Sequence, residues 1–381
     1  RYHYGHYDEF SFVSHLDKVV YAMAQKIVYW LLIALILSLG FGQLLRFEYF
    51  GIPIYLHDIL VITILALQVP YLVQNYKVRN LVIPPSLKVF LAGLVIGWIY
   101  ALFLYPISSL LIPSLYTLRL LAYLALYKVL NHKSYLINQR YFLISGFIAL
   151  LIGLLQYYLL PDMRIFQYLG WDDHLNRLTL PHFDPTFTGV MLSLSLLSVV
   201  APLSSLLSPL LLFAILLTYS RSVWLSLFLT GVFSLRNKKI ILASSILLLI
   251  SILALPQKFG EGTNLLRTYS ISSRFDNDLA YIQKYKWDLL VGRGLNTLIL
   301  DSPSSSRPIH ATGPNNSYLY LLATTGVMGL AGWGMFMYSI FQKSTHKPML
   351  IFFFTASLFN NVMFYPFALL WVLLFESSET L

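Results

Sequence analysis

The chain has 381 residues and a formal net charge of +10, with 57% hydrophobic and only 11% charged residues. Its mean hydropathy is +0.69. A soluble domain averages about 25% charged residues, so this composition excludes a water-soluble globular protein. The sequence contains no cysteine, which excludes disulfides, thiol catalysis and cysteine-ligated metals together.

Long apolar runs predict an all-α, polytopic transmembrane helical bundle. Only helices and closed barrels satisfy the backbone in lipid, and these continuous runs lack the alternation of barrel strands. Reading each run of roughly 17 to 25 residues as a span predicts about twelve spans. They lie at 28–45, 57–74, 89–105, 108–129, 141–160, 187–203, 207–219, 222–235, 240–255, 317–341, 349–363 and 365–378.

Some of the shorter runs have a second interpretation. The pairs 207–219 with 222–235, and 349–363 with 365–378, are also compatible with broken or re-entrant segments. Pro366 marks one such break, because proline cannot donate a backbone hydrogen bond within a helix.

The spans divide the chain into four parts. Residues 1–27 are expected to form an interfacial segment, and 28–255 hold the first nine spans with an outer loop at 161–186. A large outer loop follows at 256–316, between spans nine and ten, and 317–381 hold the last three spans. The second loop is long enough to form a small cap or lid.

Basic residues in the short loops predict the orientation. They all fall on one side if both termini share it, and the positive-inside rule makes that side cytoplasmic. Both long loops then face outward from a multi-pass membrane protein. The charge of +10 is therefore not interpreted as a nucleic-acid surface. The short-loop residues are Lys18, Lys26, Lys77, Arg79, Lys88, Lys128, Lys133, Arg140, Arg236, Lys238, Lys239, Lys343 and Lys347.

Arg221 lies between two apolar runs, 210–217 and 223–233, where the predicted chain turns at the outer side. A guanidinium keeps its proton and presents a planar fork of donors that suits phosphate. A charge at the edge of the bilayer is costly, which favours a functional role. Arg221 is therefore expected to bind a lipid-linked phosphate.

The 161–186 loop collects polar residues just before a span. Asp172 and Asp173, in the run Gly170-Trp171-Asp172-Asp173-His174, are interpreted mainly as solvated. For Arg177 and Asp184, a solvated role and a role in the site both stay open, since unpaired charge near the membrane is costly. Asp184 with Pro185 also predicts the start of a helix.

The 256–316 loop contributes further candidates. Arg267 and Arg274 are flanked by hydroxyls, and residues 276–287 predict an amphipathic helix. The sequence Gly292-Arg293-Gly294 favours a turn over a phosphate-binding loop, because a lone Gly-x-Gly is a weak signal. A salt-bridged surface is the alternative for the two arginines.

The end of this loop leads into the tenth span. Asn315, Asn316 and Ser317 are expected to cap that helix and to aim its N-terminal amides at an anion. His310 is the histidine best placed for proton transfer, with a solvated histidine as the alternative. Gly326 and Gly329 are interpreted as sites of close helix packing in lipid.

Polar groups also occur within the predicted spans. Arg119 lies in an otherwise apolar run, so it either pairs internally, for which Asp58 is the candidate, or lines the site. Asn360 and Asn361 are expected to join helices by hydrogen bonds.

These motifs together resemble the superfamily of O-antigen ligases and Wzy-type polymerases, integral membrane glycosyltransferases of the GT-C type. The resemblance covers most of the chain from Gln156 onward. It rests on Thr218-Tyr219-Ser220-Arg221-Ser222 with Trp224-Leu225, on 267–274 leading into Gly292-Arg293-Gly294, and on Asn315-Asn316-Ser317-Tyr318 with Gly326 and Gly329.

This resemblance implies an undecaprenyl-pyrophosphate-linked glycan as donor and a hydroxyl-bearing glycan, lipid or protein as acceptor at the outer face. Transfer would invert the anomeric carbon without a metal or another cofactor. Arg221 and Arg274 would act on the pyrophosphate, and Arg177 and Arg267 would make secondary contacts. Further substrate-binding candidates are Asp184, Asn315, Asn316 and Arg119.

One position departs from the family pattern. Its ligases usually carry a catalytic histidine where this sequence has Asn315, which cannot act as a base. Either the His310 side chain reaches the position of the family's catalytic histidine, or this protein activates its acceptor in a different way. Asp184 is the second candidate base. The function alternatives are a polysaccharide polymerase of the same superfamily and a flippase for lipid-linked sugars.

Overall fold

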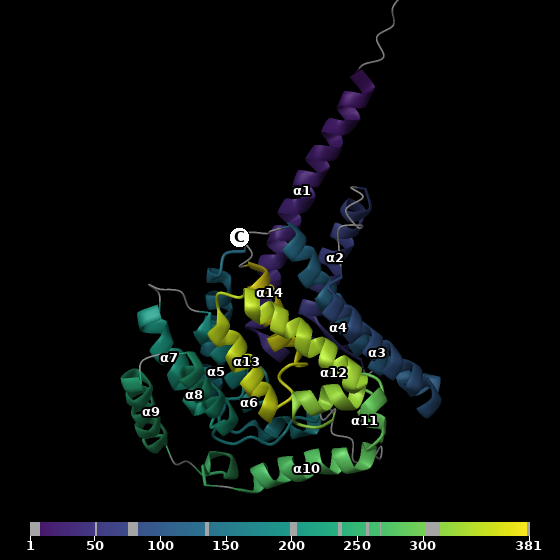
Figure 1. The fold of residues 1–381 in the computed structure, drawn as a ribbon. Coiled ribbons are helices and arrows are strands. Elements are labelled where there is room, and N and C mark those ends of the chain that lie inside the picture. Colours follow the sequence, from purple (N-terminus) through teal and green to yellow (C-terminus); the bar gives the residue numbers. More distant parts are fainter. Residues whose placement is uncertain are drawn as a thin grey trace, which may run out of the picture.

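A computed structural model describes residues 8–49, 52–74, 83–133, 137–198, 204–234, 238–256, 259–266, 268–301 and 313–378. The described chain is almost entirely helical (Figure 1). Its α-helices are α1 Asp8–Leu39, α2 Leu56–Gln74, α3 Pro85–Leu104, α4 Leu111–Lys133, α5 Arg140–Leu159, α6 Pro185–Leu197, α7 Ser204–Leu217, α8 Arg221–Ser234, α9 Lys238–Leu253, α10 Tyr269–Tyr285, α11 Asp288–Val291, α12 Ser317–Lys343, α13 Lys347–Phe359 and α14 Pro366–Ser378.

The all-α prediction is confirmed, and every predicted span overlaps one of these helices. Within the described residues, 4 helical segments are long and apolar enough to cross a membrane: Pro85–Leu104, Ile107–Asn131, Arg140–Leu159 and Ser317–Lys343. The other apolar helices are shorter, so a count of about twelve spans stays a prediction. Pro366 is the first residue of α14, which confirms the predicted break before it.

Two local features differ from the sequence-based expectation. The described part of the 1–27 segment is helical, because α1 begins at Asp8 and continues into the first predicted span. A short antiparallel hairpin, β1 Arg46–Tyr49 with β2 Ile52–Tyr55, also joins the first two predicted spans. A short hairpin forms by backbone pairing of two strands across a turn, and long apolar runs in the sequence do not indicate such pairing.

The outward face of α3 is apolar. Only 33% of its most apolar window is buried inside the protein. Val95, Ile99 and Phe103 are exposed, with 55%, 52% and 83% of their surface accessible. Such a row of exposed aliphatic and aromatic groups suits contact with lipid. These exposures support the assignment of α3 as a membrane helix.

Helices α3 and α12 pack closely through glycine. A Cβ added at Gly93 would lie 2.4 Å from the backbone nitrogen of Gly329, and one at Gly332 would lie 2.2 Å from that of Phe90. The packing role predicted for Gly329 is therefore confirmed. Close packing is also confirmed at Gly326, where an added Cβ would lie 2.5 Å from the Leu290 carbonyl oxygen of α11. Its φ of 70° in addition interrupts α12.

The interruption of α12 is satisfied by a neighbouring loop. Arg293 N–H donates to the Ala323 carbonyl at 3.0 Å, and Gly294 N–H donates to that of Thr324 at 2.9 Å. These carbonyls would otherwise be left without their partners in a continuous helix. The loop after α11 therefore depends on the break at Gly326. Gly292 and Gly294 have φ of 84° and 92°, which agrees with the expected change of chain direction, and the absence of a phosphate-binding role stays a prediction.

Helix α10 runs across one end of the bundle, crosswise to α8 and α13 (Figure 1). It begins at Tyr269 and therefore extends the amphipathic helix predicted at 276–287. Its position brings the charged residues of the 256–316 segment over the beginnings of other helices.

Candidate functional site

Three helices begin close together beneath α10. Asp184 caps α6, and its Oδ1 accepts the backbone N–H groups of Thr186 at 2.6 Å and Phe187 at 2.8 Å. Asn316 caps α12, accepting the N–H groups of Tyr318 at 2.8 Å and Leu319 at 3.2 Å. Both predicted caps are confirmed. The third helix, α8, begins at Arg221.

Side-chain hydrogen bonds connect these three starts. Ser220 Oγ donates to Thr186 Oγ1 at 3.2 Å, which joins the starts of α8 and α6. Asn360 Nδ2 donates to Ser222 Oγ at 3.0 Å, and Ser317 Oγ donates to the Asn360 carbonyl at 2.9 Å. The helix-joining role predicted for Asn360 is therefore confirmed, and α6, α8 and α12 begin around one point.

Two guanidiniums lie at this point. Arg221 Nη1 donates to the Leu265 carbonyl at 3.0 Å, and Arg274 Nη1, from α10, donates to that of Phe359 at 3.3 Å. Burial lowers the pKa of Arg274; the nearby charge of Asp184 opposes this change and that of Arg221 adds to it. Asp184, Arg221 and Arg274 therefore lie within electrostatic reach of one another, and we call them the arginine site.

The charge of Arg274 is only partly compensated. Asp184 and Asp278 both favour its charged form electrostatically. Among the described residues, however, no carboxylate forms an ion pair with it within 4.0 Å. A half-buried cation beside a second cation favours an anionic ligand, because only added negative charge offsets the mutual repulsion.

Arg177 holds the turn in front of Arg221. Its side chain is buried, with Nε donating to the Thr218 carbonyl at 2.9 Å and Nη2 to that of Tyr219 at 3.4 Å. The sequence predicted that Arg177 lies near the membrane edge, but it did not predict hydrogen bonds from Arg177 to these two carbonyls. A direct contact between Arg177 and substrate stays a prediction.

Asp278 joins α10 to the start of α12, a role that the sequence did not reveal. Its Oδ1 accepts a hydrogen bond from the Asn315 N–H at 3.1 Å, and the backbone N–H of Asn316 also donates to this carboxyl group. Burial raises the pKa of Asp278, although these hydrogen bonds and Arg274 oppose the change. Asn315 thus lies at the contact between the two helices, near Arg274.

Two of the predicted site residues, Arg267 and His310, lie outside the described residues. Their predicted roles therefore remain predictions.

Arg119 forms an ion pair between α2 and α4. Its Nη2 lies 2.6 Å from Asp58 Oδ2, and only 13% of each side chain is exposed. The guanidinium also lies over the rings of Tyr55 and Tyr116, at 5.0 Å and 4.9 Å from their centroids. Internal pairing, one of the two predicted alternatives, is therefore confirmed, and a substrate contact stays a prediction.

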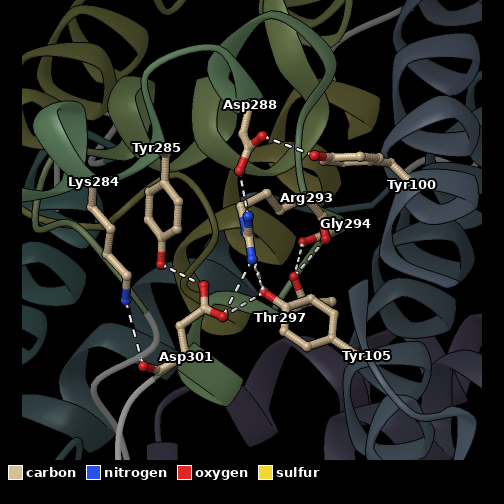
Figure 2. A network of polar contacts seen from close by, with 9 residues as sticks. All are labelled: Tyr100, Tyr105, Lys284, Tyr285, Asp288, Arg293, Gly294, Thr297 and Asp301. Carbon is tan, nitrogen blue, oxygen red and sulfur yellow. Dashed lines mark hydrogen bonds and ion pairs between the residues drawn. The ribbon is translucent and has the colours of Figure 1, made fainter. Parts of the chain in front are cut away.

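Arg293 belongs to a second polar network, at the end of α3 (Figure 2). Its guanidinium forms ion pairs with Asp288 and, at 3.3 Å, with Asp301. Tyr105 Oη accepts a hydrogen bond from Arg293 Nη2 at 2.9 Å and donates to Asp301 at 2.9 Å. This arginine connects the 256–316 segment to α3, and its fork is occupied by protein groups.

An apolar groove lies along three of the helices. Its volume is about 490 Å³, and α8, α12 and α13 line it with residues such as Phe233, Trp333, Met337 and Phe354. Met363 also lines the groove, and its N–H donates to Ser317 Oγ at 3.2 Å. One lining residue therefore connects the groove to the hydrogen bonds that join α8 to α12.

No family model matches this sequence, and a search of curated proteins finds no matching sequence. The family expectation therefore rests on the motifs of the sequence and stays a prediction.

Proposed function

We propose that the chain is a membrane glycosyltransferase that moves a glycan from an undecaprenyl-pyrophosphate carrier to a hydroxyl acceptor. The observation that supports this proposal most is the arginine site, where Arg221 and Arg274 lie within electrostatic reach of each other near three helix N-termini. The apolar groove is connected to the same helix starts through Met363 and Ser317. The resemblance to O-antigen ligases and Wzy-type polymerases gives the same chemistry.

The electrostatics of the site suit a pyrophosphate leaving group. Helix N-termini carry partial positive charge and favour anions, and α6, α8 and α12 all begin here. As the glycosidic bond breaks, negative charge grows on the bridging oxygen. Fixed cations stabilise that charge at little reorganisation cost, because they are already in position.

The groove suits the hydrocarbon part of the same donor. Its lining is almost wholly apolar and includes the exposed Phe233 and Tyr338, with 68% and 61% of their surface accessible. A polyprenyl chain in the groove would remain in contact with lipid while its pyrophosphate reached Arg221 and Arg274. The proposal therefore places the carrier across the boundary between the apolar helices and the polar cluster.

In the transfer step, the acceptor oxygen bonds to the anomeric carbon while the bond from that carbon to the pyrophosphate oxygen breaks. The leaving pyrophosphate takes the electron pair, and a base takes the acceptor proton. His310 is the first candidate base and Asp184 the second. Oδ1 of Asp184 caps α6, so its Oδ2 is the oxygen left to accept a proton.

The proposal also states which side of the membrane the site faces. Both long loops would face outward from a bacterial plasma membrane, since the short-loop lysines and arginines fall on the opposite side. Reporter fusions at Asn237 and Ser304 should therefore give opposite signals, and equal signals would contradict this orientation.

The function can be tested with the purified chain in proteoliposomes containing a labelled undecaprenyl-pyrophosphate glycan and candidate acceptors. We expect acceptor-dependent release of undecaprenyl pyrophosphate. Arg221→Lys keeps the charge but loses the planar fork, so release should fall at least about tenfold, on the order of 1.4 kcal/mol. Donor movement across the bilayer without cleavage would instead support a flippase.

A further inference from the structure

Three potential metal ligands converge next to the arginine site. Asp172 and His174 belong to the loop between α5 and α6, and Asp184 is the residue that caps α6. One ligand atom from each lies within 4.8 Å of the others. Ligand atoms bound to one zinc ion at about 2.0–2.2 Å lie up to about 4.4 Å apart, so a small side-chain movement completes the geometry.

His174 supplies an independent observation. Its Nε2 atom is buried and has no hydrogen-bond partner among the described residues. A buried nitrogen that lacks a partner costs roughly 1–3 kcal/mol, so such an atom is uncommon unless a ligand or an ion satisfies it. The imidazole therefore has the unused ligating nitrogen that a metal site needs.

The surrounding loop holds these groups in place. Met163 N–H donates to the His174 carbonyl at 2.9 Å, and Asn176 N–H donates to the Pro161 carbonyl at 2.8 Å. Together they pair residues 161–163 with 174–176, on either side of the bridge between Asp162 and Leu175.

A stacked aromatic pair fixes the other two ligands. The ring of Trp171 stacks on that of Phe183, with centroids 4.7 Å apart and an interplanar angle of 17°. Trp171 directly precedes Asp172, and Phe183 directly precedes Asp184. The stack therefore brings the two carboxylates together although they are far apart in the loop.

The local charge balance also favours a cation. Asp172 and Asp184 contribute two negative charges to the cluster, whereas the neighbouring Asp173 is not one of the three ligands. Arg177 opposes a cation electrostatically, but its guanidinium donates to the carbonyls of Thr218 and Tyr219. Arg274 also lies within electrostatic reach of Asp184.

We propose that Asp172, His174 and Asp184 bind one divalent cation, and we call them the cation site. Imidazole suits zinc and carboxylate suits manganese, so the mixed donors favour Zn²⁺ or Mn²⁺ over Ca²⁺ and Mg²⁺. The ion links the loop to the start of α6 and so positions Asp184 beside Arg274. It is a structural ion: it occupies Asp184, leaves His310 as the base of the transfer step and takes no part in that step itself. Its presence does not depend on the proposed function.

Manganese binding tests this site directly. The full chain is purified in detergent, stripped with a chelator, dialysed and titrated with Mn²⁺ while free Mn²⁺ is followed by electron paramagnetic resonance. We expect one bound ion per chain, displaced by Zn²⁺. Asp172→Asn and His174→Gln should each weaken binding at least about tenfold, because each removes one ligand. Asp173→Asn is the matched control and should bind like the wild type.

Thermal unfolding provides a second measurement if a variant binds too weakly to titrate. Zn²⁺ should raise the unfolding temperature of the wild type and of Asp173→Asn, but not that of Asp172→Asn, which lacks one of the three ligands. A wild type that binds no Mn²⁺, or equal binding by all variants, would overturn the proposal.

Discussion

Arg177 Nε donates to the backbone carbonyl of Thr218 at 2.9 Å, so a buried cation from one loop holds the turn that presents Arg221. The turn itself contains Tyr219 at a φ of 51°, a conformation that few non-glycine residues adopt. We infer that the position of Arg221 depends on Arg177 even if Arg177 does not contact substrate.

The first prediction concerns this contact. Arg177→Gln should lower the thermal unfolding temperature and also weaken donor binding, because two buried carbonyls lose a charged donor. Calorimetry and donor titration measure the two effects. Arg164→Gln is the control, since 52% of the Arg164 side chain is exposed and it pairs only locally with Asp162. Unchanged donor binding in a folded Arg177→Gln variant would show that the turn holds its shape alone.

The second prediction separates a specific role of Arg274 from a general electrostatic one. Arg274→Ala should reduce transfer far more than Lys286→Ala, since Arg274 lies next to Arg221 whereas Lys286 lies just beyond α10. Initial rates at two salt concentrations provide the measurement. Equal losses in both variants that vanish at high salt would mean that α10 contributes only long-range attraction.

The third prediction follows from the raised pKa of Asp278. A carboxyl whose folded-state pKa is raised binds its proton more tightly in the folded state, so its contribution to stability falls as the pH rises through that pKa. Asp278→Asn removes this pH dependence and keeps an oxygen for the N–H groups of Asn315 and Asn316.

Unfolding temperatures between pH 4 and pH 7 test this prediction. Asp278→Asn should be at least as stable as the wild type at pH 7, whereas Asp278→Ala should be less stable because it leaves backbone donors without an acceptor. If Asn destabilised the chain as much as Ala, the attraction between Asp278 and Arg274 would outweigh burial.

The fourth prediction concerns the acceptor's base. If His310 takes the acceptor proton, His310→Ala should lower transfer at neutral pH and leave donor binding intact. The wild-type rate should fall below about pH 6.5 as imidazole becomes protonated. Asn315→His in the His310→Ala background tests whether a base at the family position restores transfer. An unchanged pH–rate profile in His310→Ala would transfer the role to Asp184.

Local sequence signals predicted much of this fold. Apolar runs located the helices because burial in lipid or in the core requires them, and Asp184 and Asn316 were identified as caps because capping depends on neighbouring residues alone. The apolar runs on either side of Arg221 also predicted correctly that one helix ends just before it and the next begins there.

Contacts between distant segments could not be predicted in this way. Nothing in the sequence indicates that Arg177 faces the Thr218 carbonyl, or that Asp278 accepts from Asn315. The break in α12 at Gly326 was also missed, because its backbone conformation depends on the loop at Arg293 that completes the broken helix. Such roles depend on packing between elements, which periodicity does not encode.

Binding of undecaprenyl pyrophosphate to the purified chain in nanodiscs tests the central claim most directly. Arg221→Ala and Arg274→Ala should each weaken binding at least about tenfold, on the order of 1.4 kcal/mol, because each removes a fixed cation from the pyrophosphate. The control Arg164→Ala should bind like the wild type. Undiminished binding in both folded arginine-site variants would contradict the assignment of Asp184, Arg221 and Arg274 as the donor site.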